Sequence, residues 1–421
     1  MNIGNVLKLE REEMDKLKHN NKYNIIGGLL GTLVGASAGY LSTYLKALGG
    51  NDYHFALLNA FPSMIAMFVL IPGAMIIDGA KNKLRTTLFV CFISRIFFLL
   101  YALVPFLPKD LQAISLVVLM GLRNAPEAIW SIGYQSLVAD VFPINKLNSI
   151  IGTRSKFNSI LTMGATFILG TYLTLNEKYP IDSILLYKIL FIFTFGVGII
   201  EIMQYKNFIF EPKQIQKTES YARKFLNAIK SLPKHPRYIK YCATVIIFYL
   251  GWQMAQPLYS IYQLDVLKAN AAWIGYLNIT STLVQFLTTS MWMRLADKFG
   301  SRVILGICMS LMGLSPFVYA ISTTLPMLLV MQLIVGSGMA GAITLLFNEL
   351  IGVSPDENRT LYISLFTCLT QFTSSFMPFV GILIKRAFSI QIALFTSAAI
   401  RFIGAAILLW AFRHEKQTEH N

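Results

Sequence analysis

Two charged residues stand four positions apart in an otherwise apolar part of this sequence. Arg123 and Glu127 belong to LRNAPEAIW, within LQAISLVVLMGLRNAPEAIWSIGYQSLVA. Residues four apart share one face of a helix, so the guanidinium and the carboxylate can meet. Burial favours the protonated form of a glutamate and a nearby arginine favours the ionised form. The spacing therefore predicts a carboxylate that binds and releases a proton; the alternative is a static ion pair within one helix.

The composition indicates a membrane protein. The chain has 421 residues, of which 55% are hydrophobic and 14% are charged, whereas a soluble domain has about 25% charged residues. Apolar stretches of about 20 residues recur, each long enough to cross a hydrocarbon core of about 30 Å. We expect an all-α polytopic protein with twelve transmembrane helices, near residues 24–46, 54–77, 86–107, 111–139, 157–175, 184–205, 241–262, 272–295, 303–322, 326–350, 360–384 and 390–412.

The basic residues predict the orientation. Placing the N-terminus inside puts most Lys and Arg residues on the inner side, which is the cytoplasmic side because these residues resist translocation. We expect a multi-pass protein of the cytoplasmic membrane with both termini in the cytoplasm and no removable signal peptide. The net charge of +15 then reflects topology and contact with membrane lipid, and no nucleic acid partner is expected.

The chain divides into two similar halves. The longest polar stretch, residues 206–240, separates two sets of six spans whose landmarks recur at an offset of roughly 217 residues, as in transporters built from repeats. We predict a cytoplasmic N-terminal segment (1–23), an N-terminal six-helix bundle (24–205), a cytoplasmic linker with an amphipathic helix (206–240), a C-terminal six-helix bundle (241–412) and a cytoplasmic tail (413–421).

Motifs for catalysis or cofactor binding are not found. The four cysteines, Cys91, Cys242, Cys308 and Cys368, have no paired spacing. Nothing resembles a phosphate-binding loop, a nucleophile elbow or a metal-ligand pattern. We therefore expect no enzyme, no cofactor and no metal site.

The loop MRLADKFGSR resembles a signature of the major facilitator superfamily. The matching residues are Asp297, Lys298, Gly300 and Arg302. The equivalent first-half loop, GAMIIDGAKNK, keeps Asp78 and Lys83 but has Gly79 where the family has a cation. A second match is SPDENR, with Pro355 and Arg359. The resemblance covers the whole chain and implies twelve helices in two six-helix bundles, with the two loops forming a cytoplasmic gate.

The resemblance also implies which side chains line a central cavity. In the family the first, fourth, seventh and tenth spans line it, and Arg123 occupies an arginine position that tunes proton coupling. The expected substrate-binding residues on these spans are Tyr40, Tyr44, Asn124, Trp130, Trp252, Gln253, Gln256 and Tyr259. On the third and twelfth spans, which the family places at the periphery, we expect Arg95 and Arg401 to pair locally or reach lipid headgroups. Glu201 and Glu349 are expected to make contacts at a gate or a helix end.

These features predict a secondary active transporter working by alternating access. The expected cargo is a small organic solute exported with proton coupling, by a protein that acts as a monomer. One alternative is a solute–proton symporter or facilitator. The other is a non-transporting membrane sensor on a transporter fold.

Overall fold

The computed structural model describes residues 3–210, 229–355 and 359–411. Within these ranges the chain forms helices and no strands, so the all-α class is confirmed. The described residues contain twelve helices of at least 21 residues and one short helix, α2. Their bounds are α1 (Ile3–Ala38), α2 (Leu41–Ala47), α3 (Asp52–Asp78), α4 (Lys83–Leu103), α5 (Lys109–Val141), α6 (Ile144–Leu173), α7 (Ser183–Lys206), α9 (Pro236–Ile261), α10 (Ala271–Phe299), α11 (Ser301–Ile321), α12 (Leu325–Val353), α13 (Arg359–Ala387) and α14 (Ile390–Ala411).

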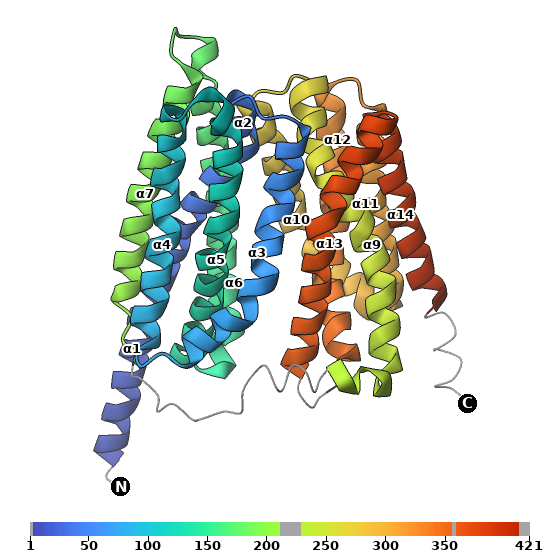
Figure 1. The fold of residues 1–421 in the computed structure, drawn as a ribbon. Helices are drawn as coiled ribbons and strands as arrows, with labels where there is room; N and C mark the ends of the chain where they lie inside the picture. Colours follow the sequence, from blue (N-terminus) through green and yellow to red (C-terminus); the bar gives the residue numbers. More distant parts are fainter. Residues whose placement is uncertain (1–2, 211–228, 356–358, 412–421) are drawn as a thin grey trace, which may run out of the picture. The chain divides into compact units, whose positions relative to one another are not determined.

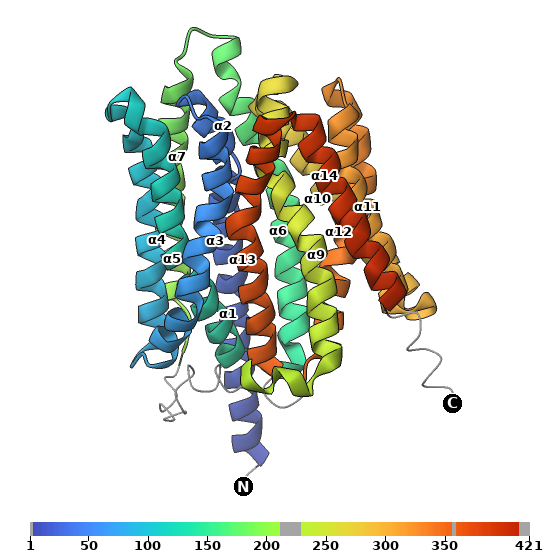
Figure 2. The ribbon, with the colours of Figure 1, turned by 45° about the vertical axis from the view of Figure 1, so that its right-hand side comes forward.

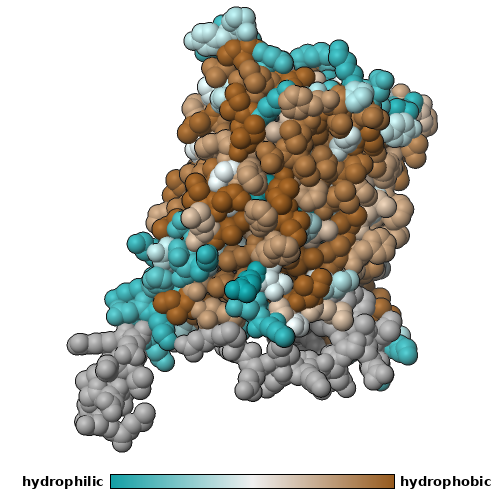
Figure 3. Space-filling model, turned by 60° about the vertical axis from the view of Figure 1, so that its left-hand side comes forward, coloured by the Kyte–Doolittle hydropathy of each residue, from teal (hydrophilic) through white to brown (hydrophobic). Residues whose placement is uncertain are grey.

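The apolar surface of these helices identifies a multi-pass membrane protein. Eight of the described helical segments are long and apolar enough to cross a membrane. Helices α5, α6, α9 and α10 are long but less apolar; α5 carries the charged pair and α9 carries two glutamines. On the face seen in Figure 3, hydrophobic side chains form a band with hydrophilic ones towards its two ends.

The predicted duplication is visible in the packing of the helices. In the first half α1 packs against α6 and α7, and α4 packs against α5 and α7. In the second half α9 packs against α13 and α14, and α11 packs against α12 and α14 (Figures 1 and 2). The same four neighbour relations therefore recur in chain order.

The chain forms two compact units. The first comprises Met1–Tyr44 and Phe68–Lys217, and the second comprises Leu45–Met67 and Thr218–Asn421. The last residues of α2, from Leu45, and the part of α3 up to Met67 thus belong to the second unit by their contacts, although they precede most of the first unit in sequence. Three contacts hold them there, namely Lys46–Asp265 at 2.5 Å, Asp52–Lys385 at 2.5 Å and Arg386 stacked 3.8 Å from the ring centre of Tyr53.

The polar N-terminal segment, the linker and the C-terminal tail predicted from the sequence are described only in part. The predicted polar segment 1–23 is continuous with the first span, because α1 already begins at Ile3. Most of the predicted amphipathic helix of the linker, and the tail 413–421, lie outside the described residues.

Candidate functional site

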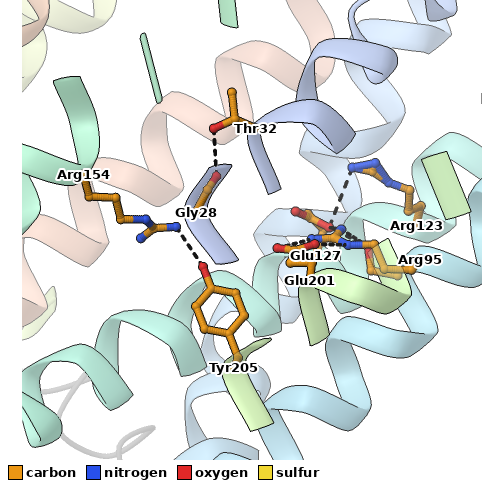
Figure 4. Close-up of polar contacts among 9 residues, drawn as sticks. Gly28, Thr32, Arg95, Arg123, Glu127, Arg154, Glu201 and Tyr205 are labelled. Carbon is orange, nitrogen blue, oxygen red and sulfur yellow. Dashed lines mark hydrogen bonds and ion pairs between the residues drawn. The ribbon is translucent and has the colours of Figure 1, made fainter. Parts of the chain in front are cut away.

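A cluster of four charged side chains lies inside the first unit. Arg95 on α4 donates from Nη1 to Glu127 Oε2 on α5 at 2.8 Å. Its Nε and Nη2 donate to the two carboxylate oxygens of Glu201 on α7, at 2.9 and 3.3 Å. One guanidinium therefore joins two acids from two different helices (Figure 4).

Arg123 is not the nearest cation to Glu127, which differs from the sequence-based interpretation. Its Nη2 lies 3.7 Å from Glu127 Oε2, and its guanidinium stacks 4.8 Å from the ring centre of Phe98. Glu127 instead accepts hydrogen bonds from Ser94 Oγ at 2.5 Å and from Arg95. The closest partners therefore come from α4, not from the neighbouring turn of α5.

The four members differ in accessibility. The side chains of Arg95 and Glu201 are 3% and 2% exposed, whereas that of Glu127 is 32% exposed and that of Arg123 is 15% exposed. Buried charges are tolerated when they are paired and hydrogen-bonded, as Arg95 and Glu201 are. Glu127 is thus the more exposed of the two acids of the cluster.

Two glycines create the space for the sealed part of the cluster. A Cβ atom on Gly31 of α1 would lie 2.7 Å from Glu201 Oε1, and one on Gly198 of α7 would lie 2.7 Å from Arg95 Cδ. A glycine face allows helices to approach this closely in a membrane. Gly27, one turn before Gly31, lies against the ring of Tyr205, so two glycines of α1 permit its close approach to α7.

A second polar group lies beside the cluster. Arg154 on α6 donates to the hydroxyls of Tyr134 and Tyr205, and its guanidinium lies 4.3 Å from the ring centre of Tyr134. Tyr134 in turn donates to Asn24 Oδ1 at 2.6 Å. Figure 4 shows Arg154 and Tyr205 approaching Gly28 of α1. This group joins four helices of the first unit.

The predicted substrate residues of the first unit have mixed environments. Tyr40 and Tyr44 are fully buried, and their hydroxyls donate to the carbonyls of Thr166 and Tyr101, at 2.6 and 3.0 Å. Asn124 is half-buried. Trp130 is buried, with its ring 5.7 Å from that of Tyr134 and 5.4 Å from that of Tyr205. In this structure the two tyrosines and Trp130 pack within the unit.

The predicted residues of the second unit are the half-buried side chains of α9, namely Trp252, Gln253, Gln256 and Tyr259. The ring of Tyr259 lies 4.5 Å from that of Tyr319, and the guanidinium of Arg401 lies 5.8 Å from its ring centre. Along the sequence of α9, the immediate neighbours of both glutamines are apolar residues.

Arg401 of α14 lies inside the second unit. Its side chain is 2% exposed, so the expectation that it reaches lipid is wrong. Nη1 donates to the carbonyl of Met312 at 3.0 Å, and Nη2 donates to that of Trp252 at 3.3 Å. Pro316 has no backbone N–H to offer the carbonyl four residues earlier, which is Met312. Arg401 therefore satisfies a carbonyl that a proline has freed.

The predicted gate residues form one similar ion pair in each unit. Lys83, at the start of α4, lies 2.9 Å from Asp140 near the end of α5. Arg302, at the start of α11, lies 2.9 Å from Glu349 near the end of α12. These pairs occupy equivalent places in the two repeats, and the second agrees with the expected helix-end role of Glu349.

The remaining gate residues are at helix ends. Asp78 is the last residue of α3. Asp297 and Lys298 are exposed at the end of α10. Gly300 ends that helix with a φ of +94°, a backbone conformation that favours glycine. This explains one position of the signature loop by local geometry.

Sequence reasoning missed the centre of the charge cluster. Arg95 was expected to pair locally or to reach lipid headgroups, and Glu201 to make contacts at a gate or a helix end. The structure shows the local pairing for Arg95, which meets Glu201 and Glu127 inside the first unit. The available signal was their charge within apolar spans, because such residues usually face a bundle interior and pair. Their partners are 106 and 32 positions away in sequence, so spacing could not pair them.

The described residues contain no group of three or more His, Cys, Asp or Glu side chains that could hold a metal ion. The four cysteines are free thiols.

Residues 241–421 match the family model described as Major Facilitator Superfamily. A search of curated proteins finds no match.

Solved structures share the fold at low sequence identity. The nucleoside transporter NupG has a TM-score of 0.73 and 12% identity, covering 93% of this chain and 100% of its own. An inward-facing bacterial homologue of the iron transporter ferroportin has a TM-score of 0.69 and 14% identity, and the match covers 92% of this chain and 97% of that one. An inward-facing, unoccupied bacterial homologue of the human lysosomal transporter Spinster has a TM-score of 0.67 and 12% identity, and the match covers 95% of this chain and 97% of that one.

Residues 241–421, which include the signature loop, match this family model, and the chain shares its fold with the solved transporter structures. The resemblance inferred from the signature loop is thereby confirmed. The chain is a multi-pass membrane protein, and its fold is that of solved membrane transporters.

Proposed function

We propose that this protein is a secondary active transporter that exports a small organic solute across the cytoplasmic membrane in exchange for protons. It works as a monomer by alternating access between its six-helix bundles, residues 24–205 and 241–412, with both termini in the cytoplasm. The observation that carries the proposal is the half-exposed Glu127 carboxylate, held by Ser94 and Arg95 at the edge of a sealed ion pair.

Proton coupling follows from the way the charge of Glu127 is offset. An ionised carboxylate among apolar helices is stable only while a cation stays close. Any conformation that moves α4 relative to α5 changes the distance between Arg95 and Glu127, and with it the affinity of Glu127 for a proton. By linkage, proton binding then favours one conformation over the other. Arg123, the second cation of the pair, tunes the same equilibrium.

Cargo recognition is assigned to the aromatic and amide side chains of the cavity-lining spans. Trp252, Gln253 and Gln256 offer stacking surface and both hydrogen-bond donors and acceptors on α9. This mixture suits an amphipathic organic molecule. Tyr259, Tyr40, Tyr44, Asn124 and Trp130 complete the proposed set, and the solutes named for structures of the same fold differ too widely to identify the cargo.

The cytoplasmic gate is assigned to the repeated ion pairs and the signature loops. Lys83 and Arg302 anchor the inner ends of α4 and α11 in the two units. Asp78, Asp297, Lys298 and Gly300 complete the proposed gate. Breaking either anchor is proposed to change the balance between inward-facing and outward-facing conformations.

A test begins with a screen for ligands that raise the melting temperature of the purified protein at two pH values. A stabilising compound is then assayed in proteoliposomes, both for accumulation driven by a pH gradient and for exchange without a gradient. We expect Glu127→Gln to lose gradient-driven accumulation and to keep exchange. Asp110→Asn, which removes an exposed acid at the start of the same helix, is the matched control and should keep both.

Each other outcome has a defined meaning. Gradient-driven accumulation that survives in Glu127→Gln removes this residue from the coupling mechanism. Accumulation driven by protons moving together with the solute indicates a symporter. A ligand that binds with no measurable flux indicates a sensor.

A further inference from the structure

We infer that Glu201 is a positioning residue that sets the pH at which Glu127 takes up its proton, and that it acts through Arg95. This inference rests on the proposed function, because it assumes that Glu127 is the proton-binding acid. It concerns an acid for which the sequence suggested only a contact at a gate or a helix end.

The geometry makes the two carboxylates competitors for one cation. Arg95 gives two donors to Glu201, through Nε at 2.9 Å and Nη2 at 3.3 Å, and one donor to Glu127, through Nη1 at 2.8 Å. A fork of this kind fixes the plane of the guanidinium. Glu201 therefore holds Arg95 in the orientation that aims its remaining donor at Glu127.

Glu201 cannot itself meet the cargo. Its side chain is 2% exposed, and its Oε1 faces the Gly31 backbone of α1 with no room for an added methyl group. One turn further along the same glycine face, Gly27 approaches the ring of Tyr205. A group enclosed in this way influences transport only through its neighbours.

The charged and titratable neighbours of both acids are few. Around Glu201 they are Cys91 and Arg95 of α4, Arg154 of α6, Tyr205 of α7 and Glu127 of α5. Around Glu127 they are Cys91, Arg95 and Tyr101 of α4, Arg123 of α5 and Glu201 of α7. Arg95 is the one guanidinium that makes close ion pairs with both carboxylates among the described residues.

The sign of the effect follows from the charges. In Glu201→Gln the amide oxygen still accepts from Arg95, so Arg95 stays beside Glu127. Arg95 then faces one carboxylate instead of two, and a negative charge near Glu127 is removed. The ionised form of Glu127 is then more stable, so its protonation requires a lower pH. Two unit charges roughly 7 Å apart at an effective dielectric constant of about 20 correspond to a shift of roughly 1–2 pH units.

The experiment follows protonation directly, so it needs no cargo. The full-length protein in lipid nanodiscs is titrated with acid and followed by infrared difference spectroscopy of protonated carboxyl groups. The band of Glu127 is assigned by its loss in Glu127→Gln. We expect this band to appear at a pH lower by about 1–2 units in Glu201→Gln, and at an intermediate pH in Glu201→Asp.

Glu201→Asp keeps the charge and serves as the variant that still folds if Glu201→Gln does not. Asp182→Asn, which neutralises the exposed acid at the N-terminal cap of α7 and keeps a capping side chain, is the matched control and should leave the band in place. A Glu127 band whose midpoint is unchanged or raised in both Glu201 variants overturns this inference alone. The absence of any Glu127 band in the unsubstituted protein overturns the proposed function instead.

Discussion

Arg401 offers a sharp test of how this fold satisfies its backbone. Its guanidinium bonds the Met312 carbonyl that Pro316 leaves without a helical partner. Arg401→Met removes this donor and leaves the carbonyl unsatisfied inside the second unit. Pro316→Ala supplies a backbone N–H to the same carbonyl. We therefore predict that Arg401→Met destabilises the protein less in the Pro316→Ala background than in the original chain.

The magnitude follows from the bond that is replaced. An unsatisfied buried carbonyl costs about 1–3 kcal/mol, while hydrogen bonds between membrane helices measured by double-mutant cycles average about 0.6 and reach about 1.7 kcal/mol. The bond is charge-assisted and has a length of 3.0 Å, so we expect a coupling of about 1–2 kcal/mol. Because Arg401→Met is made in both backgrounds, the free energy gained by no longer burying a cation cancels in the double-mutant cycle. What remains is the coupling between Arg401 and Pro316.

The assay is the free energy of unfolding of the four proteins in mixed detergent micelles. Pro257→Ala is the matched control, because Pro257 frees the carbonyl of Gln253, whereas Arg401 bonds that of Trp252. The cost of Arg401→Met should be the same with and without Pro257→Ala. A coupling with Pro316 that is within error of zero, or equal to that with Pro257, would refute the reasoning.

Two further predictions concern packing and charge in the two units. Gly31→Ala should destabilise the protein by about 1–3 kcal/mol because its Cβ would overlap the Glu201 carboxylate. Gly35→Ala, whose Cβ would have nothing within 4 Å, should stabilise the protein by about 0.5–1 kcal/mol. Thermal unfolding of both variants tests this, and equal effects would contradict the packing argument. Asp52→Lys and Lys385→Asp should each lower the unfolding free energy by about 1 kcal/mol, and the double swap should restore most of it because their half-buried ion pair re-forms; a swap no better than the single variants shows that the pair contributes nothing.

Local features of the sequence were sufficient to predict the helical class and its repeats. Apolar length and the recurrence of landmarks act along the chain, so they can be read without partners. The structure agrees, with twelve long helices in the described residues and the same neighbour relations in each half. The glycine of the signature loop is likewise explained by a single backbone angle.

Local spacing was a poor guide to the ion pairs. Arg123 and Glu127 are neighbours on one helix face, yet the closer cation to Glu127 is Arg95. The reason is that α4 packs against α5 with the side chain of Arg95 directed at Glu127. A four-residue spacing indicates that two side chains on one helix can reach each other. The packing of the other helices determines which cation lies closest to the acid.

The sequence by itself determined that this chain crosses a membrane many times, has two similar halves and carries charges where lipid cannot stabilise them. Only the tertiary structure decided that Glu201 is sealed behind Gly31, that Arg95 serves two acids and that Arg401 bonds a carbonyl freed by Pro316. The physical reason is range. Hydrophobicity and helix periodicity are properties of neighbouring residues, whereas pairing a buried charge depends on groups that are distant in sequence and close only after folding.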